Sequence, residues 1–220
     1  MSTETMAPST PTRVDWRRAE FVLTLFAFVG FLTLPVRLGT IYAGLPAHPL
    51  LIHIPVILIP ASVLGALACV ARPALFDRYG TLLAGTSIVA MASIFPAMQA
   101  GSALQADLQL QGAAAGLIAR HSHAAHILAF AFVAFTAILI LTFAADRISG
   151  GSPTGLGIVD RLLSPRSSYV ALRVVLVLLA VGCAYMIFKV GDLGAKAVWQ
   201  GRLQHVGGGP GPGGFPPPPS

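Results

Sequence analysis

The sequence predicts an all-α integral membrane protein, a helical bundle with a four-helix core and one extra N-terminal transmembrane helix. Apolar side chains make up 55% of the 220 residues and charged side chains only 10%, whereas an ordinary soluble domain has roughly 25% charged residues. A chain of this composition cannot cover its own surface in water. The apolar residues also form long runs, and helices satisfy their backbone groups within a bilayer.

The first apolar segment, 21–36, belongs to the extra transmembrane unit predicted over 16–43 and follows Arg17 and Arg18. A basic start before an apolar core is also typical of a signal peptide. We favour an uncleaved helix, because this apolar run is longer than the usual signal core and no good cleavage site precedes His48. The Thr-, Ser- and Pro-rich residues 1–15 are expected to be disordered.

A membrane domain is predicted over 44–200, where four further apolar segments occur. They lie at 49–71, 79–98, 123–145 and 169–188. Each spans or nearly spans a hydrocarbon core of about 30 Å at about 1.5 Å per helical residue. Pro55 and Pro60 predict a bend in the first of the four. The Gly- and Pro-rich tail, 201–220, is expected to be disordered.

Positive charge predicts the orientation, because Lys and Arg near short loops are retained on the cytoplasmic side. With a cytoplasmic N-terminus, the inner set is Arg13, Arg17, Arg18, Arg72, Arg78, Arg147, Arg161, Arg166 and Arg173, and the outer set is Arg37, Arg120, Lys189, Lys196 and Arg202. Arg173, inside an apolar run, is expected to extend toward the inner surface. The cations form no stripe, so the net charge of +6 indicates no nucleic-acid partner.

This orientation places all six histidines on the outer side. They are His48, His53, His121, His123, His126 and His205. His48 and His53 point about 140° apart on a regular helix, so they cannot both face one ligand. We interpret His48, before Pro49, as a boundary residue. His53 lies about 7.5 Å deeper, and if it is functional it should point into the bundle. His123 and His126 share one helix face.

Two cofactor chemistries suit imidazoles at membrane depth, where a polar group needs a partner. Imidazoles from two facing helices can ligate haem b iron, which predicts His53 with His123 or His126 as cofactor ligands. Alternatively, a zinc or copper site would draw on His48, His53, His121, His123, His126 and Asp192. Histidines also bond backbone carbonyls without any ligand, and Asp192 and Lys196 also suit an exposed helix pair.

Two sequence boxes resemble a known family. Residues 44–55, GLPAHPLLIHIP, are similar to the opening box of an uncharacterised bacterial family of membrane proteins, domain of unknown function 2231. That box has a His-Pro pair and a second His at a helix start. Residues 188–199, FKVGDLGAKAVW, resemble the closing box of its actinobacterial members, whereas ARHSHAAH matches the family's intervening helix start only loosely.

The resemblance covers about 44–199 and implies a multipass protein of the bacterial plasma (inner) membrane. Some relatives are fused to cytochrome or iron–sulfur domains, which favours redox work, but the resemblance supplies no activity. With the histidines, it predicts electron transfer between the membrane and an outer-face redox partner.

The alternative function is a structural or assembly protein without a cofactor, binding another membrane protein through small-residue faces such as Ala61, Gly65 and Cys69. A small transporter ranks last, because no charged residue lies deep in the second, third or fourth segment. The sequence has no Gly-rich phosphate loop, paired acidic catalysts or Ser-His-Asp arrangement, so an enzymatic activity is neither predicted nor excluded.

Overall fold

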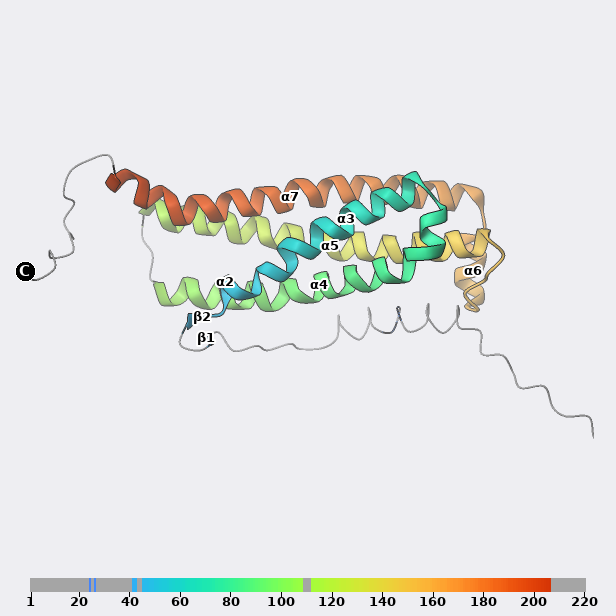
Figure 1. Cartoon of the computed structure of the whole chain (residues 1–220), viewed down its shortest axis with the longest axis horizontal. Coiled ribbons are helices and arrows are strands. Elements are labelled where there is room, and N and C mark those ends of the chain that lie inside the picture. Colours follow the sequence, from blue (N-terminus) through green and yellow to red (C-terminus); the bar gives the residue numbers. More distant parts are fainter. Residues whose placement is uncertain (1–23, 25, 27–40, 43–44, 109–111, 207–220) are drawn as a thin grey trace, which may run out of the picture.

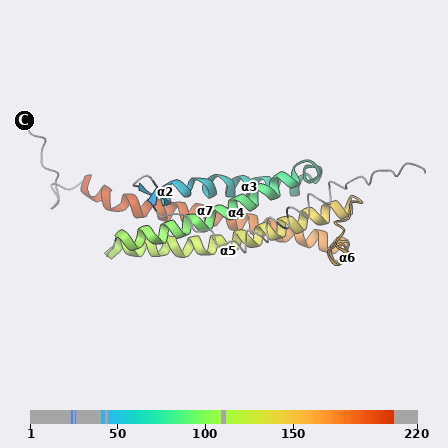
Figure 2. The ribbon, with the colours of Figure 1, turned by 90° about the horizontal axis from the view of Figure 1, so that it is seen from below.

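The computed structural model describes residues 24, 26, 41–42, 45–108 and 112–206, and in this part of the chain four long helices run along a common axis (Figures 1 and 2). The elements are β1 Ile41–Tyr42, β2 Leu45–Pro46, α2 His48–Leu51, α3 His53–Ala71, α4 Ala74–Leu108, α5 Gly112–Ser149, α6 Gly157–Leu163 and α7 Arg166–Val206. The two short strands pair antiparallel. Successive long helices run in opposite directions (Figure 1).

The long helices form a closed ring of contacts. α4 packs against α3 and α5, and α7 packs against α5 and back against α3. Four stretches of the described chain are long and apolar enough to cross a membrane, and they lie at His48–Ala71, Ala74–Ala106, Ala115–Ser149 and Arg166–Trp199. The predicted four-helix membrane core is therefore confirmed. The extra segment, 21–36, lies outside the described residues apart from Thr24 and Phe26, which are helical.

The helices extend beyond the apolar segments that predicted them. α4 has 35 residues, α5 has 38 and α7 has 41, which at about 1.5 Å per residue gives lengths of roughly 50 to 60 Å, well beyond a core of about 30 Å. Backbone hydrogen bonding continues where hydropathy falls. α7 also runs through residues 201–206 of the predicted disordered tail, while 207–220 and 1–15 lie outside the described residues.

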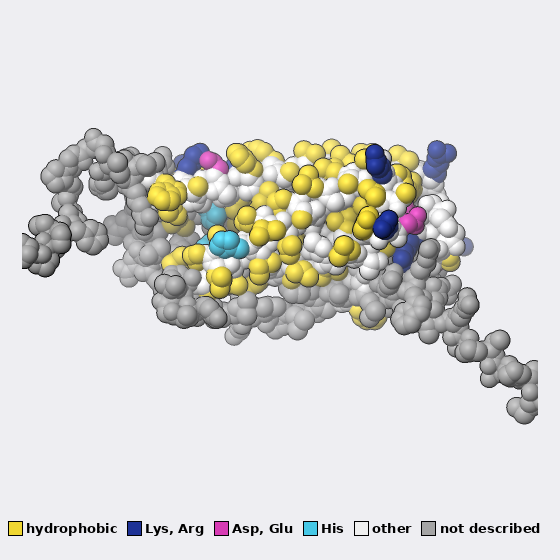
Figure 3. Space-filling view, viewed as in Figure 1, with side chains coloured by type: hydrophobic (Ala, Val, Ile, Leu, Met, Phe, Trp, Pro, Cys, Tyr) yellow, Lys and Arg dark blue, Asp and Glu magenta, His cyan; other side chains and the backbone are white. Residues whose placement is uncertain are grey.

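The bundle interior is built from aromatic, aliphatic and small side chains. The rings of Phe132 and Phe135 stack with centroids 5.2 Å apart, and those of Phe76 and Phe143 lie 6.3 Å apart. All four are fully buried. Figure 3 shows the complementary surface, with hydrophobic side chains along the middle of the visible face and charged ones toward the two ends.

One close helix contact makes a direct test of this packing. A Cβ added at Gly80 of α4 would overlap the ring of Phe143, whereas nothing lies within 4 Å of a Cβ at Gly85. We expect Gly80→Ala to lower the free energy of unfolding by about 1–3 kcal/mol through overpacking. Gly85→Ala, the matched control, should leave it unchanged or raise it by up to about 1 kcal/mol. Equilibrium unfolding in detergent measures both, and equal effects would contradict the packing.

Candidate functional site

The histidines of the described chain belong to elements that meet at one end of the bundle. α2 and the first turns of α5 lie at this end, together with the last turns of α4 and α7, whereas α6 lies at the opposite end (Figure 1). The histidines visible in Figure 3 lie at the α2 end. We call these two ends the α2 end and the α6 end. The short helix α2 and the start of α5 thus bring imidazoles from distant parts of the sequence to one level.

Two of these imidazoles, His48 and His121, reach across to a neighbouring helix. Nδ1 of His48 lies 2.8 Å from the carbonyl oxygen of Ala97 on α4, and Nδ1 of His121 lies 2.9 Å from that of Val190 on α7. Both bonds are partly buried. A carbonyl oxygen only accepts, so in each ring Nδ1 carries the hydrogen and donates it. In the neutral form, Nε2 then keeps a lone pair for a further partner.

The two rings bond to different helices. They come from different halves of the bundle, because His48 bonds to α4 and His121 to α7. The α2 end therefore holds two imidazoles, each bonded at Nδ1 to a backbone carbonyl of a different long helix.

The histidines that the sequence favoured are at the same end but face the surface. His53, His123 and His126 have exposed side chains. Nδ1 of His53 lies 3.3 Å from the carbonyl oxygen of Leu50, and Nδ1 of His126 lies 2.8 Å from that of Ser122, so both bond within their own part of the chain.

His48 is the first residue of α2, which agrees with its interpretation as a boundary residue, but it also makes the contact that was expected of His53. The two side chains do diverge, as five residues of helix require. Depth along the helix favoured His53, but the contact with α4 is made by His48. The expectation that His53 points into the bundle is therefore wrong, and its assignment as a ligand stays a prediction.

The residues predicted for a zinc or copper site do not form a multidentate group. Nowhere in the described part of the chain do three or more His, Cys, Asp or Glu side chains come together in a way that would hold a metal ion. A carboxylate oxygen of Asp192 accepts a hydrogen bond from Lys196 at 2.7 Å, and both side chains are largely exposed. The interpretation of Asp192 and Lys196 as an exposed helix pair is confirmed.

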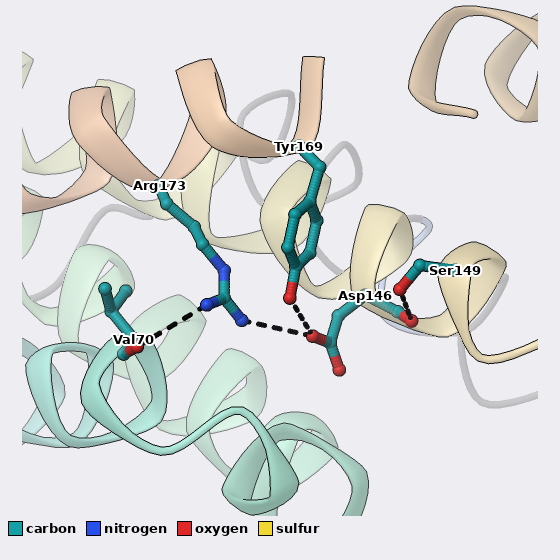
Figure 4. A network of polar contacts seen from close by, with 5 residues as sticks. All are labelled: Val70, Asp146, Ser149, Tyr169 and Arg173. Atoms are coloured by element: carbon teal, nitrogen blue, oxygen red, sulfur yellow. Dashed lines mark hydrogen bonds and ion pairs between the residues drawn. The ribbon is translucent and has the colours of Figure 1, made fainter. Parts of the chain in front are cut away.

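Near the α6 end, a polar network joins three helices (Figure 4). A carboxylate oxygen of Asp146 on α5 accepts hydrogen bonds from Tyr169 at 2.8 Å and from Arg173 at 3.2 Å, both on α7. Arg173 also points toward the carbonyl oxygen of Val70 on α3, at 3.5 Å. Asp146 is only 8% exposed. The network therefore ties α3, α5 and α7 together through a largely buried ion pair.

Sequence reasoning missed this network. Asp146 follows the predicted apolar segment 123–145 and was not singled out. Arg173 was expected to extend to the membrane surface, which is wrong because its guanidinium bonds inside the bundle. The available signal was their position in the apolar runs. Asp146 directly follows the run 123–145, and Arg173 lies near the beginning of the run 169–188. In antiparallel neighbours, such positions lie at the same depth.

The fold and the paired imidazoles define a multipass helical membrane protein with polar groups gathered at both ends of an apolar bundle. The chain belongs to the DUF2231 family, described as predicted membrane protein, whose model matches residues 44–207. This match confirms the resemblance seen in 44–55 and 188–199, and it leaves the first apolar segment outside the family region. No curated protein and no solved structure matches the chain.

Proposed function

We propose that the protein binds haem b at the α2 end through His48 and His121 and transfers electrons between the membrane and a partner at that face. The observation that carries the proposal is the pair of Nδ1–H donors bonded to the carbonyl oxygens of Ala97 and Val190. Metal-ligating histidines almost always donate their other ring N–H in this way, which fixes the tautomer and raises the basicity of the ligating nitrogen.

Ligand number favours haem over a single bare metal ion. Zinc sites draw three or four ligands from the protein, and the described residues bring no such group together. Haem needs only axial ligands from the chain, because the macrocycle supplies the others. When bound, it would supply a one-electron couple. His48 and His121 would hold the iron from two different helices, and the carbonyl bonds would set the angle of each ring.

A cofactor-free assembly protein is the second function with an observation in its favour. Only 17% of the apolar window of α7 is buried, compared with 56% in α4 and in α5. α7 thus offers a long apolar face to lipid or to a helix of another membrane protein. In this case the bonds made by His48 and His121 would serve only to join helices.

One experiment separates the two functions. The full chain is expressed with a haem precursor supplied, purified in detergent, and examined by absorbance and metal analysis. We expect a Soret band with about one haem per chain. A folded protein without a Soret band and without stoichiometric metal would end the cofactor proposal and leave the assembly function.

The proposed orientation places the α2 end outside the bacterial plasma membrane and the N-terminus in the cytoplasm, as the Lys and Arg distribution favours. His123 and Arg161 are exposed, whereas the native Cys69 and Cys183 are buried. We expect a membrane-impermeant maleimide to label His123→Cys in intact spheroplasts and Arg161→Cys only after lysis. The reverse pattern would contradict this orientation.

A further inference from the structure

His48 and His121 pack against their neighbouring helices in the same way, each on one carbonyl group and one glycine. We call such a carbonyl and glycine together a glycine seat. His48 bonds the carbonyl of Ala97 and its ring lies against Gly101, four residues further along α4. His121 bonds the carbonyl of Val190 and its ring lies against Gly194, again four residues further along α7. The repeated spacing of carbonyl and glycine places each ring over one helical turn of its neighbour.

The missing side chain at each glycine makes room for the ring. A Cβ at Gly101 would lie 2.9 Å from Cε1 and 3.0 Å from Nδ1 of His48. A Cβ at Gly194 would lie 3.2 Å from Cε1 and 3.3 Å from Nδ1 of His121. The first contact is shorter than real Cβ atoms show, and the second is tight enough that the ring would have to shift by a few tenths of an ångström. In each case the crowded atoms include the nitrogen that donates to the carbonyl.

The repetition extends to the rest of each half of the bundle. His48 and His121 are each followed five residues later by a histidine, His53 and His126, whose Nδ1 bonds a carbonyl three or four residues back. In each half, the histidine-bearing helix precedes the helix that carries the glycine seat. α2, α3 and α4 make one half, and α5 and α7 make the other. The two half-sites are therefore equivalent in sequence order and in contacts.

We propose that Gly101 and Gly194 are positioning residues, which hold His48 and His121 as the Nδ1–H tautomer and so present Nε2 as the free nitrogen of two equivalent half-sites. This arrangement suits a ligand that takes one nitrogen from each of two sides, as the iron of a planar macrocycle does. The choice of ligand rests on the proposed function, whereas the glycine seats stand on the contacts alone.

A double-mutant cycle tests the seats without any cofactor. Gly101→Ala should lower the unfolding midpoint of the full chain in detergent, and it should have little effect in the His48→Ala background, where the crowded ring is gone. It should keep its full effect in the His121→Ala background. Gly194→Ala should lower the midpoint by less. It should have little effect in the His121→Ala background and keep its effect in the His48→Ala background. Gly191→Ala, with nothing within 4 Å of its added Cβ, is the control on α7.

Positioning is tested by the tautomers themselves. In ¹⁵N-histidine NMR spectra, His48 and His121, assigned through His48→Gln and His121→Gln, should carry hydrogen at Nδ1. Gly101→Ala should move His48 alone toward the Nε2–H form, and Gly194→Ala should move His121 alone. Haemin affinity should fall about 10–100-fold in each, as for loss of an outer-shell partner.

The outcomes separate the two claims. If the Gly and His substitutions have additive effects on the unfolding midpoint, or if the tautomers do not change, the proposed role of the glycines is wrong whatever ligand binds there. Coupled effects with no haemin binding would leave the seats standing and reject the proposed function.

Discussion

His48→Gln and His121→Gln are each expected to lower haemin affinity by more than about 100-fold. Each would remove a nitrogen proposed to hold the iron, and loss of only the outer-shell partner of a ligand already costs about 10–100-fold. Glutamine retains an N–H group that can donate to the carbonyl of Ala97 or Val190. The unfolding midpoint of the apoprotein should therefore change little. Titration of the purified chain with haemin, followed at the Soret band, measures the affinity.

The exposed histidines supply the matched controls. His53→Gln, His123→Gln and His126→Gln should bind haemin as the original chain does, because their side chains lie on the surface. Loss of binding in His53→Gln together with His123→Gln or His126→Gln, with binding kept in His48→Gln, would instead support the pair that the sequence favoured.

Arg173→Met is expected to lower the free energy of unfolding by about 3–5 kcal/mol, which is the usual cost of removing one partner from a buried ion pair. Arg173 lies 3.2 Å from Asp146, and their side chains are only 16% and 9% exposed. The substitution leaves the carboxylate of Asp146 in the bundle with no cation bonded to it. Equilibrium unfolding in detergent measures the loss.

An exposed pair in the same helix gives the control. Lys196 and Asp192 are 2.7 Å apart, but their side chains are 53% and 40% exposed. Lys196→Met should therefore change the free energy of unfolding by no more than about 0.5 kcal/mol. The double replacement Asp146→Asn with Arg173→Met should recover part of the loss. Equal effects for Arg173→Met and Lys196→Met would contradict a structural role for the network.

Hydropathy was sufficient to predict the four-helix membrane core, because a long apolar run has few alternatives to a membrane-spanning helix. It did not predict where the helices end. α4 continues through residues 102–108, which include Ser, Gln and Asp. The segment stays helical although its hydropathy is lower than that of the preceding run. Helix ends depend on local backbone bonding, which average hydropathy does not record.

The candidate site was predicted only at the level of residue type and bundle end. The sequence placed histidines from two segments at one side, and His48 and His121 were among the residues named. Which of them turn inward depends on the rotation of each helix about its axis. That rotation is set by contacts such as those of Gly101 and Gly194 with the rings, which link residues far apart in the sequence. The pairing of Asp146 with Arg173 was missed for the same reason.

The central claim is that His48 and His121 together hold one haem iron. Electron paramagnetic resonance of the oxidised, haem-loaded protein tests it most directly, because the spin state reports the axial ligands. We predict a low-spin ferric signal that both His48→Gln and His121→Gln abolish and that His53→Gln, His123→Gln and His126→Gln leave unchanged. A high-spin signal in the original chain, or a low-spin signal that survives both substitutions, would contradict the claim.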